Sequence, residues 1–362
     1  MMRWDDLPEV VSPVGRRLTD LLAEGPRRQE LPGYEPMYRD FVDYILRCTH
    51  RIWEEKNIGL CRSHYDADCV MHTLAGPAIG AKTVVQNTIG SIGMSSDRQI
   101  IGQDVVWSDD ADGGNGDGIL HSSHRILAQM THLGDDAMMG PASFRGGGAT
   151  TIADCACRAN RIVEEWLVRD NWRAVAQVGG DPWAVAQAQA ADDRGGDPAR
   201  HRWRADAIAA VRAGGDTGVA ADHPAAIPAA MLIAAFRDDL FDDAAQALSP
   251  AAEIRWPSMR RGHGRGYWIG CATQVRAMLH DAAMTIDHAA ARPLPHGDIA
   301  VAIRWSLAGR HAGTGPWGPA TGRDLLVMAI SHYRLRAGAI IEDVTVFDEL
   351  AVLRQVAGGL GA

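Results

Sequence analysis

The stretch Gly140-Pro141-Ala142-Ser143-Phe144-Arg145 recurs later in the chain as Gly318-Pro319-Ala320-Thr321-Gly322-Arg323. In each copy an aspartate follows the first glycine at the same spacing, at Asp170 and at Asp348. Both landmarks therefore recur at one constant interval, which is close to half of the chain. A repeat of this length predicts a duplicated domain, because the units of solenoid proteins are far shorter.

Upstream landmarks also occur twice and in the same order. They are His132-Leu133-Gly134 with His311-Ala312-Gly313, and Gly76 and Gly80 with Gly262 and Gly266. The glycine pair lies further from the Gly-Pro-Ala landmark in the first copy than in the second, so the first copy is expected to hold an insertion. The Gly/Asp-rich run 109–118 suits such an insertion, because surface loops tolerate added residues, and the second copy has the shorter connection 293–298.

Length and composition bound the class of protein. We expect four parts in the 362 residues: an N-terminal arm (1–35), a first domain (36–180), a linker (181–227) and a second domain (228–362). The net charge of −9 argues against nucleic acid or an acidic membrane surface as a partner. Six cysteines in a chain this long predict no disulfide framework. Without an apolar leader or an apolar run of membrane length, the expected location is the cytoplasm.

Hydrophobic periodicity predicts the same order of elements in both copies. In the first copy we expect helices at 38–55, 60–65, 82–90 and 171–178, and strands at 69–73, 98–108, 118–130, 150–159 and 162–168. In the second we expect helices at 228–248, 271–279 and 349–356, and strands at 253–256, 285–291, 299–310, 325–335 and 339–347. Further helices are expected at 14–23, 183–191 and 202–213. The layout is α+β, with long, mostly antiparallel strands.

Several of these segments resemble one known family. Tyr65-Asp66-Ala67-Asp68-Cys69-Val70-Met71-His72, followed by Gly76 and Gly80, resembles the first strand of the SnoaL-like polyketide cyclases, which belong to the nuclear transport factor 2-like superfamily. The runs 160–166 and 337–343, each followed by the repeated aspartate, resemble that family's last strand, and the turn 318–323 resembles the segment two strands earlier. The resemblance covers about residues 36–180 and 228–358.

The resemblance implies two tandem cone-shaped domains, each a curved sheet wrapped around helices with one pocket at the wide end. Members of the family usually pair through their sheets, so an intramolecular pseudo-dimer or a homo-oligomer is expected. The family's catalytic aspartate would lie three residues before Asp170 and Asp348. Leu167 and Thr345 occupy those positions, so aldol ring closure by that aspartate is not expected in either copy.

Strand alternation offers a replacement for the missing acid. If Leu167 and Thr345 face the pocket, then Glu165 and Asp343, two residues earlier, face it as well. Apolar walls would raise the pKa of such a carboxyl group and suit it to act as a general base. The alternative is a carboxylate paired with an arginine on the sheet. Asp170 and Asp348 fall on the opposite face and are interpreted as caps of the helices that follow them.

Two histidines are candidate acids. His72 lies on the first strand, where the family often has a polar pocket residue, and the second copy has Trp256 at the matching place. In His121-Ser122-Ser123-His124 only one histidine can face the pocket, and the apolar residues that share its face favour His124. For each of them, an ordinary hydrogen-bonded histidine is the alternative.

The sequence therefore predicts cofactor-free acid/base chemistry on a small, largely apolar molecule, meaning cyclisation, isomerisation or elimination next to a carbonyl. Glu165 would be the base, His72 or His124 the acid, and Asp343 the counterpart in the second copy. The expected substrate contacts are Trp53, Tyr65, Trp166, Leu167, Trp256 and Thr345. The histidine and cysteine spacing fits no metal site. The competing interpretation is a binding or carrier protein that uses the same pockets without chemistry.

Overall fold

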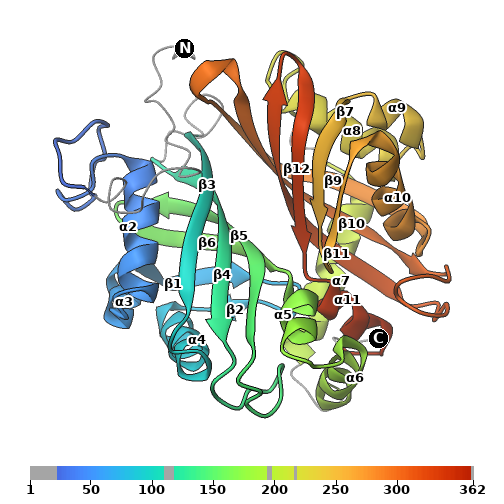
Figure 1. Cartoon of the computed structure of the whole chain (residues 1–362), viewed down its shortest axis with the longest axis horizontal. Coiled ribbons are helices and arrows are strands. Elements are labelled where there is room, and N and C mark those ends of the chain that lie inside the picture. Colours follow the sequence, from blue (N-terminus) through green and yellow to red (C-terminus); the bar gives the residue numbers. More distant parts are fainter. Residues whose placement is uncertain (1–22, 110–117, 194–197, 216–217, 360–362) are drawn as a thin grey trace.

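The computed structural model describes residues 23–109, 118–193, 198–215 and 218–359, without the side chains of 198–201. Most of the expected helix at 14–23 and of the insertion at 109–118 lies outside these residues. Two six-stranded sheets form the centre of the molecule, and helices cover the side of each sheet that faces away from the other (Figure 1). No helix in these ranges combines the length and the apolar character needed to cross a bilayer.

The first half follows the predicted order closely. Its helices are α2 (Phe41–Trp53), the 3-10 turn η2 (Ile58–Leu60), α3 (Cys61–His64), α4 (Ala81–Met94) and α5 (Asn171–Gln177). Its strands are β1 (Tyr65–His72), β2 (Ala78–Ile79), β3 (Gln99–Asp109), β4 (Leu120–Thr131), β5 (Gly146–Arg158) and β6 (Arg161–Arg169).

The second half repeats this order. Its helices are α8 (Ala226–Phe236), α9 (Phe241–Ala245), α10 (Gly264–Arg276) and α11 (Glu349–Val356), with the 3-10 turn η4 (Pro295–Gly297). Its strands are β7 (Leu248–Trp256), β8 (Arg260–His263), β9 (Leu279–Pro293), β10 (Ile299–His311), β11 (Asp324–Arg336) and β12 (Ala339–Phe347). Between the halves lie α6 (Pro182–Asp193) and α7 (Pro198–Ala213).

The two sheets have the same topology. The strand orders are β2-β1-β6-β5-β4-β3 and β8-β7-β12-β11-β10-β9. In each sheet one pair is parallel, β1 with β6 and β7 with β12, and every other pair is antiparallel. The predicted α+β class with two tandem, sheet-bearing halves is confirmed.

Three local predictions differ from the structure. The expected helix 228–248 is interrupted between α8 and α9, where Asp239 has a positive φ of 59° that no α-helix accommodates. Helix α10 begins about two turns earlier than expected, at Gly264. Strand β1 begins at Tyr65, four residues before the expected strand 69–73, and so includes Asp66 and Asp68. The short strands β2 and β8 were not predicted, because such short segments carry no measurable alternation.

The glycine repeat has a structural cause and a corrected register. Gly80 and Gly264 both precede or open a helix with φ near +80°, and a Cβ at either would approach a backbone carbonyl oxygen within 3 Å. Only glycine satisfies both conditions. Gly80 therefore corresponds to Gly264, and not to Gly266. The connection from β3 to β4 covers 110–119 and that from β9 to β10 covers 294–298, so the first copy is the longer one at the predicted place.

The two sheets pack against each other through the faces that the helices leave uncovered (Figure 1). We call these the outer faces, and the helix-covered ones the inner faces. Arg304 of β10 donates to Asp154 of β5 at 3.2 Å and stacks on Trp166, with 3.5 Å from its guanidinium carbon to the ring centroid. Arg125, which holds the same position on β4, lies 3.8 Å from Glu342 of β12. Such reciprocal contacts are characteristic of a two-fold symmetric dimer interface, formed here within one chain.

The helices after the last strands are fixed as predicted. Asp170 accepts a hydrogen bond from the Arg173 amide, and Asp348 accepts one from the Ala351 amide, each at 3.1 Å. Both aspartates are N-caps, of α5 and α11 respectively. Asn171 also donates to Asp348 at 2.6 Å, so the two caps join the halves at the base of the molecule.

Arg304→Ala tests the packing of the sheets. The variant leaves the buried Asp154 carboxylate without its cation, and breaking a buried pair in this way costs about 3 kcal/mol. Urea denaturation should show this loss in the free energy of unfolding. Arg310→Ala on the same strand is the control, because its solvent-exposed pair with Asp281 should contribute little to stability. Equal losses in both variants would contradict the assigned interface.

Candidate functional site

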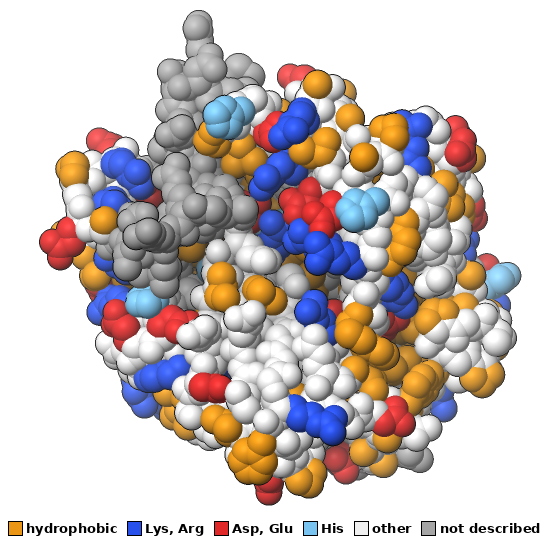
Figure 2. Space-filling view, viewed as in Figure 1, with side chains coloured by type: hydrophobic (Ala, Val, Ile, Leu, Met, Phe, Trp, Pro, Cys, Tyr) orange, Lys and Arg blue, Asp and Glu red, His pale blue; other side chains and the backbone are white. Residues whose placement is uncertain are grey.

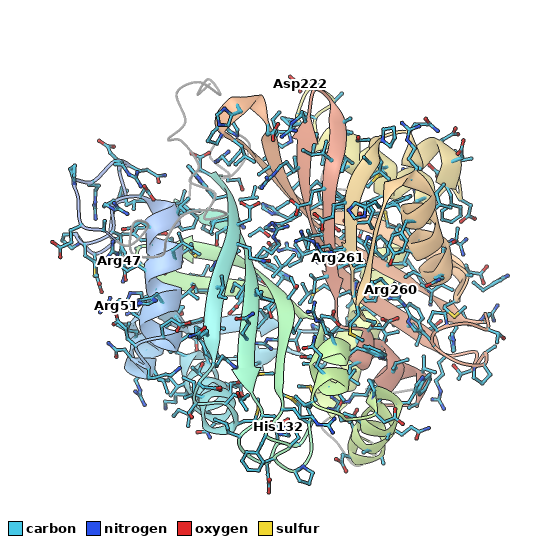
Figure 3. The ribbon with its side chains drawn as sticks, in the orientation of Figure 1. Arg47, Arg51, His132, Asp222, Arg260 and Arg261 are labelled. Carbon is cyan, nitrogen blue, oxygen red and sulfur yellow. The ribbon has the colours of Figure 1, made fainter. Side chains whose placement is uncertain are left out.

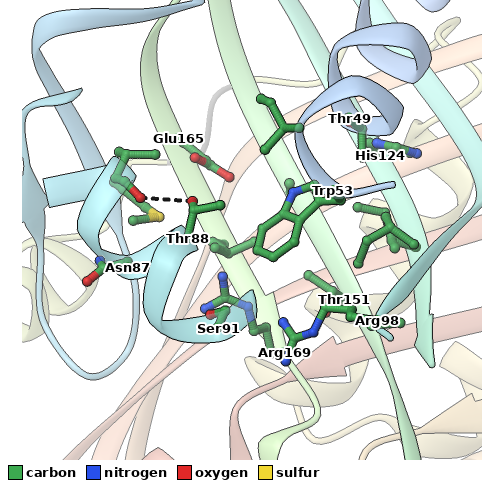
Figure 4. A pocket seen from close by; sticks show the side chains of 18 of the residues that line it. Thr49, Trp53, Asn87, Thr88, Ser91, Arg98, His124, Thr151, Glu165 and Arg169 are labelled. Atoms are coloured by element: carbon green, nitrogen blue, oxygen red, sulfur yellow. Dashed lines mark hydrogen bonds between the residues drawn. The ribbon is translucent and has the colours of Figure 1, made fainter. Parts of the chain in front are cut away.

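A cavity of about 330 Å³ opens in the first half, between α2, α4, α5 and the inner face of the first sheet (Figure 4). Its walls are largely apolar, and they hold a few polar side chains. The apolar lining includes Ile45, Ile52, Met71, Val84, Ile126, Met139 and Leu167, and the polar lining includes Asn87, Ser91, Arg98, His124, Thr151, Glu165 and Arg169. A concave, mainly apolar site with few polar groups is the usual form of a small-molecule pocket.

Glu165 lies in the cavity wall on β6 and is only 6% exposed. Burial raises the pKa of its carboxyl group, while Arg169 and hydrogen bonding from Tyr65 favour the charged form. Its Oε2 atom is buried and has no hydrogen-bond partner. A desolvated carboxyl oxygen with an unused lone pair is available to accept a proton from a bound molecule.

His124 lines the same cavity but does not contact Glu165. On β4, His124 pairs with Ala153 of β5, and Ala153 pairs with Leu167 of β6. His124 is therefore two strands away from β6 and level with Leu167, which is two residues after Glu165. Its Nε2 has no partner and points toward β3, where a Cβ on Gly102 would lie 3.1 Å away. Burial lowers the pKa of His124 to about 4, so the ring is neutral near pH 7. A ligand in the cavity could reach both groups, whereas no direct proton transfer joins them.

The structure places His72 and Trp166 outside the cavity, contrary to the sequence expectation. Both are on the outer face of the sheet, where their rings stack at 5.2 Å and His72 hydrogen-bonds Glu164 at 2.7 Å. The strand register also changes the assigned counterpart of His72. His72 is opposite Trp166 and Arg255 is opposite Val344, which makes Arg255 the equivalent of His72 in place of Trp256. The inner neighbour on β1 is Met71, not His72.

The remaining expected residues of the first half line the cavity. Trp53 of α2, Tyr65 of β1 and Leu167 of β6 all belong to its wall. The sequence interpretation missed Arg98 and Arg169. Strand alternation contains the signal for Arg169, because it follows Glu165 and Leu167 on the same face of β6. Arg98 was expected to begin the strand 98–108, but it lies just before β3, which begins at Gln99.

The corresponding space in the second half is filled by aromatic side chains. Trp268, Trp305 and Trp317 are fully buried there. They stand where the first half has Val84, Ile126 and Met139, all of which line the cavity. Phe236 stacks on Trp305 at 5.2 Å and adds a further buried ring. Each tryptophan adds far more volume than the residue it matches, so this half is a packed core.

Asp343, the counterpart of Glu165, has its hydrogen bonds satisfied inside that core. Its Oδ2 accepts from the indole nitrogens of Trp256 at 3.1 Å and Trp268 at 2.8 Å, and its Oδ1 accepts from Thr345 at 2.7 Å. Burial still raises the pKa of Asp343 to about 6. The expected pocket contacts Trp256 and Thr345 are therefore parts of a buried network around Asp343.

That network has one possible direction. An indole nitrogen can only donate, so Trp305 donates to the Ser331 hydroxyl at 3.0 Å. Ser331 and Thr345 are 2.7 Å apart, and Thr345 donates onward to Asp343. A relay that ends on a carboxylate and begins at a tryptophan fixes side-chain positions, and both oxygens of Asp343 are used for bonds within the protein. Among the described residues, no group of three or more His, Cys, Asp or Glu is arranged to hold a metal ion.

Comparison with known proteins agrees with this architecture. The model of the SnoaL-like polyketide cyclases matches residues 229–356, and the first half repeats the strand order of that segment. Residues 229–356 are therefore similar to the SnoaL-like polyketide cyclases, and the two sheets of equal strand order fit two tandem copies of that fold. A comparison with curated protein sequences gave no match.

Solved structures similar to part of the chain include the putative polyketide cyclase IdmH from Streptomyces antibioticus, with 22% identity over 38% of this chain and 97% of that one and a TM-score of 0.32. TsrD from Streptomyces laurentii has 20% identity over 37% and 96% of the chains, with a TM-score of 0.32. A hypothetical protein from Catenulispora acidiphila with a ketosteroid isomerase-like fold, solved with trimethylamine, has 18% identity over 35% and 90%, with a TM-score of 0.29.

Replacing the two equivalent acids by apolar residues of similar size should have unequal effects on stability. Asp343→Leu leaves two buried indole N–H groups and one hydroxyl without an acceptor, and we expect a loss of about 3 kcal/mol. Glu165→Met removes a desolvated carboxyl group with an unpaired oxygen, so the free energy of unfolding should fall by less than about 1 kcal/mol or increase. Urea denaturation of the ligand-free variants measures both. A similar loss in both would show that Glu165 has a structural role.

Proposed function

We propose that the first half of this protein is an enzyme that moves a proton on a small, largely apolar molecule without a cofactor. The reaction class is proton abstraction next to a carbonyl, followed by cyclisation, isomerisation or elimination. The observation that carries the proposal is the contrast between Glu165, which lines an open cavity with an unpaired oxygen, and Asp343, whose oxygens are bonded in a filled core.

Glu165 is suited to the role of base for two reasons. Its raised pKa makes it a stronger proton acceptor than an exposed glutamate, and the apolar wall excludes competing water. The position that the family resemblance gives to a catalytic aspartate is Leu167, one pocket-facing step along the same strand. A base on Glu165 would act on a proton located about 7 Å further along the strand, and so on a differently placed substrate atom.

Tyr65 and His124 are the candidates for the group that meets the developing oxyanion. Burial raises the pKa of the Tyr65 hydroxyl well above its ordinary value, so it remains a donor at neutral pH. The neutral His124 ring can also donate one N–H. Tyr65 lies closer to the base, because hydrogen bonding links it to Glu165. We assign Tyr65 as the first candidate donor and His124 as the second.

One observation favours the competing function of a carrier. No acid makes a hydrogen bond to Oε2 of Glu165, and His124 is two strands away, so Tyr65 is the only acid that the described residues hold against the base. A pocket that only binds would need no acid at Oε2. The two functions differ in one respect, since a carrier releases its ligand unchanged.

Glu165→Gln separates enzyme from carrier. The purified wild type is incubated with a metabolite extract, and native mass spectrometry then follows any retained small mass with time. We expect the wild type to bind a mass and convert it, and Glu165→Gln to bind the same mass and convert it at least about a hundredfold more slowly, as for loss of a general base. Asp343→Asn is the matched control, because the equivalent acid of the second half does not line the cavity.

Conversion in Glu165→Gln at the wild-type rate would overturn the role of Glu165. If the wild type retains a small mass without converting it, the protein is a carrier and the proposed enzymatic function is wrong. The pH dependence gives an independent check. Only the deprotonated carboxylate is a base, so the wild-type rate should fall as the pH drops through a pKa above the ordinary glutamate value.

A further inference from the structure

Arginines far outnumber lysines in the chain, so the informative ones are those that lack a carboxylate partner. On the surface, basic side chains gather over the edge of the second sheet, where Arg260 and Arg261 of β8 are labelled (Figures 2 and 3). These charges are already matched. Arg260 bonds both oxygens of Glu349, and Arg261 bonds Glu253 at 2.9 Å. This surface is neutralised internally and offers no site for an anion.

The cavity, in contrast, contains arginines that lack a carboxylate partner. Arg98 and Arg169 both line it, and they lie near each other below Trp53 in the close view (Figure 4). Their mutual repulsion is one of the influences that lower the pKa of Arg98 to about 10, after burial as the larger cause. No hydrogen bond or ion pair within the described part of the chain involves the guanidinium group of Arg169. Burial lowers the pKa of Arg169, and its side chain reaches the open cavity, where part of it is exposed.

Arg98 is satisfied almost as poorly. The only hydrogen bond of its guanidinium group in the described structure runs to the Met130 sulfur at 3.0 Å, and a thioether is a weak acceptor. Its Nε is buried without a partner, and its guanidinium carbon lies 5.6 Å from the centre of the Trp53 ring. At pH 7 both arginines are charged, so the cavity holds two unpaired cations with several unused N–H donors.

Asp97 and Asp136 attract Arg98, and Glu165 and Asp348 attract Arg169. None of these carboxylates forms an ion pair with either guanidinium group in the described structure. Oδ1 of Asp136 accepts hydrogen bonds from the backbone amides of Met138 and Met139 at 2.8 and 2.9 Å. Two unpaired guanidinium groups in a partly apolar cavity are unfavourable alone, and a bound oxyanion would satisfy both.

We propose that Arg98 and Arg169 form an oxyanion-binding subsite, and that the ligand of this cavity is a small apolar molecule carrying a carboxylate or a phosphate. The inference deepens the proposed function, on which it rests for the chemistry at Glu165. The anionic group sits at the end of the cavity near Arg98, Ser91 and Asn87, and the apolar body extends toward Leu167 and Glu165. The arginines thereby hold the substrate in register with the base, and their positive charge stabilises negative charge that develops as the proton leaves.

Three ligands with one shared body test the subsite. They are 2-naphthoate, its neutral amide 2-naphthamide, and 2-naphthyl phosphate, titrated into the purified full chain by calorimetry at low salt. We expect the wild type to bind at least one anion about tenfold or more tightly than the amide, as for charge-assisted hydrogen bonds. Arg98→Gln and Arg169→Gln should each lose most of that preference while binding the amide unchanged, which also shows that the cavity is intact.

Arg158→Gln is the matched control. Arg158 ends β5 at an exposed position outside the cavity, so its variant should keep the preference for the anion. The comparison of the two anions identifies the source, since the phosphate or the carboxylate will bind more tightly. Equal affinity of the wild type for anion and amide, no binding of any of the three ligands, or an unchanged preference in both cavity variants would overturn the proposal.

The anion subsite and the proposed function can be refuted separately. Binding needs no proton transfer, so Glu165→Gln should bind the anion as tightly as the wild type or more tightly, because it removes a negative charge from the cavity. A selective anion site together with an unchanged conversion rate in Glu165→Gln would refute the base and keep the subsite. Loss of conversion in Glu165→Gln without anion selectivity would keep the base and refute the subsite.

Discussion

The packing of the two sheets against each other determines what the rest of the molecule can do. Each sheet has two faces, and the outer ones are used up by contacts such as Arg304 with Asp154 and Ser123 with His332 at 2.8 Å. The cavity that holds Glu165 lies on the inner face of the first sheet, which curves around the helices. This explains why alternate residues on one strand differ so strongly. On β6, Glu164 bonds His72 at the interface while Glu165 lines the cavity. A slip of one residue in register would exchange the two acids.

Duplication within one chain relaxes a constraint that a homodimer must obey. In a symmetric dimer both pockets have identical walls, whereas the linked halves can diverge. Here the second half has tryptophan at three positions that line the cavity of the first, and Asp343 is surrounded by donors. The well-packed half contributes the stable partner for the interface. The other half can then keep an open cavity with unsatisfied groups, because its stability does not depend on its own core alone.

The sequence predicted those features that depend on the internal repeat or on the alternation of side chains along a strand. The duplication, the α+β class and the long strands follow from spacing, and the structure has them. The family resemblance implied the inward side of Leu167, and strand alternation extended it to Glu165; both line the cavity, as does His124. What the sequence could not predict depends on residues distant in the chain. The outward side of His72 depends on its pairing with Trp166 across a parallel strand pair. The filling of the second pocket requires knowing that Trp268 and Trp305 converge, although a helix and a strand far apart in the chain carry them. The missed Arg98 lies at the boundary of an expected strand, and its side chain reaches the cavity beside Arg169, which is distant in the chain.

The unsatisfied groups of the first half are the strongest sign that it binds something. Buried polar atoms in native proteins nearly always find partners, and the oxygens of Asp343 in the second half follow this rule. Unpaired buried atoms occur in both halves, but those of Glu165, His124 and Arg98 all border one cavity. Desolvated groups without partners cost stability, so three of them around one cavity are the arrangement expected of a functional site. The donors and the acceptor lie at different positions along the cavity, in agreement with the proposed ligand that carries an anionic group at one end and an acidic C–H or O–H further along.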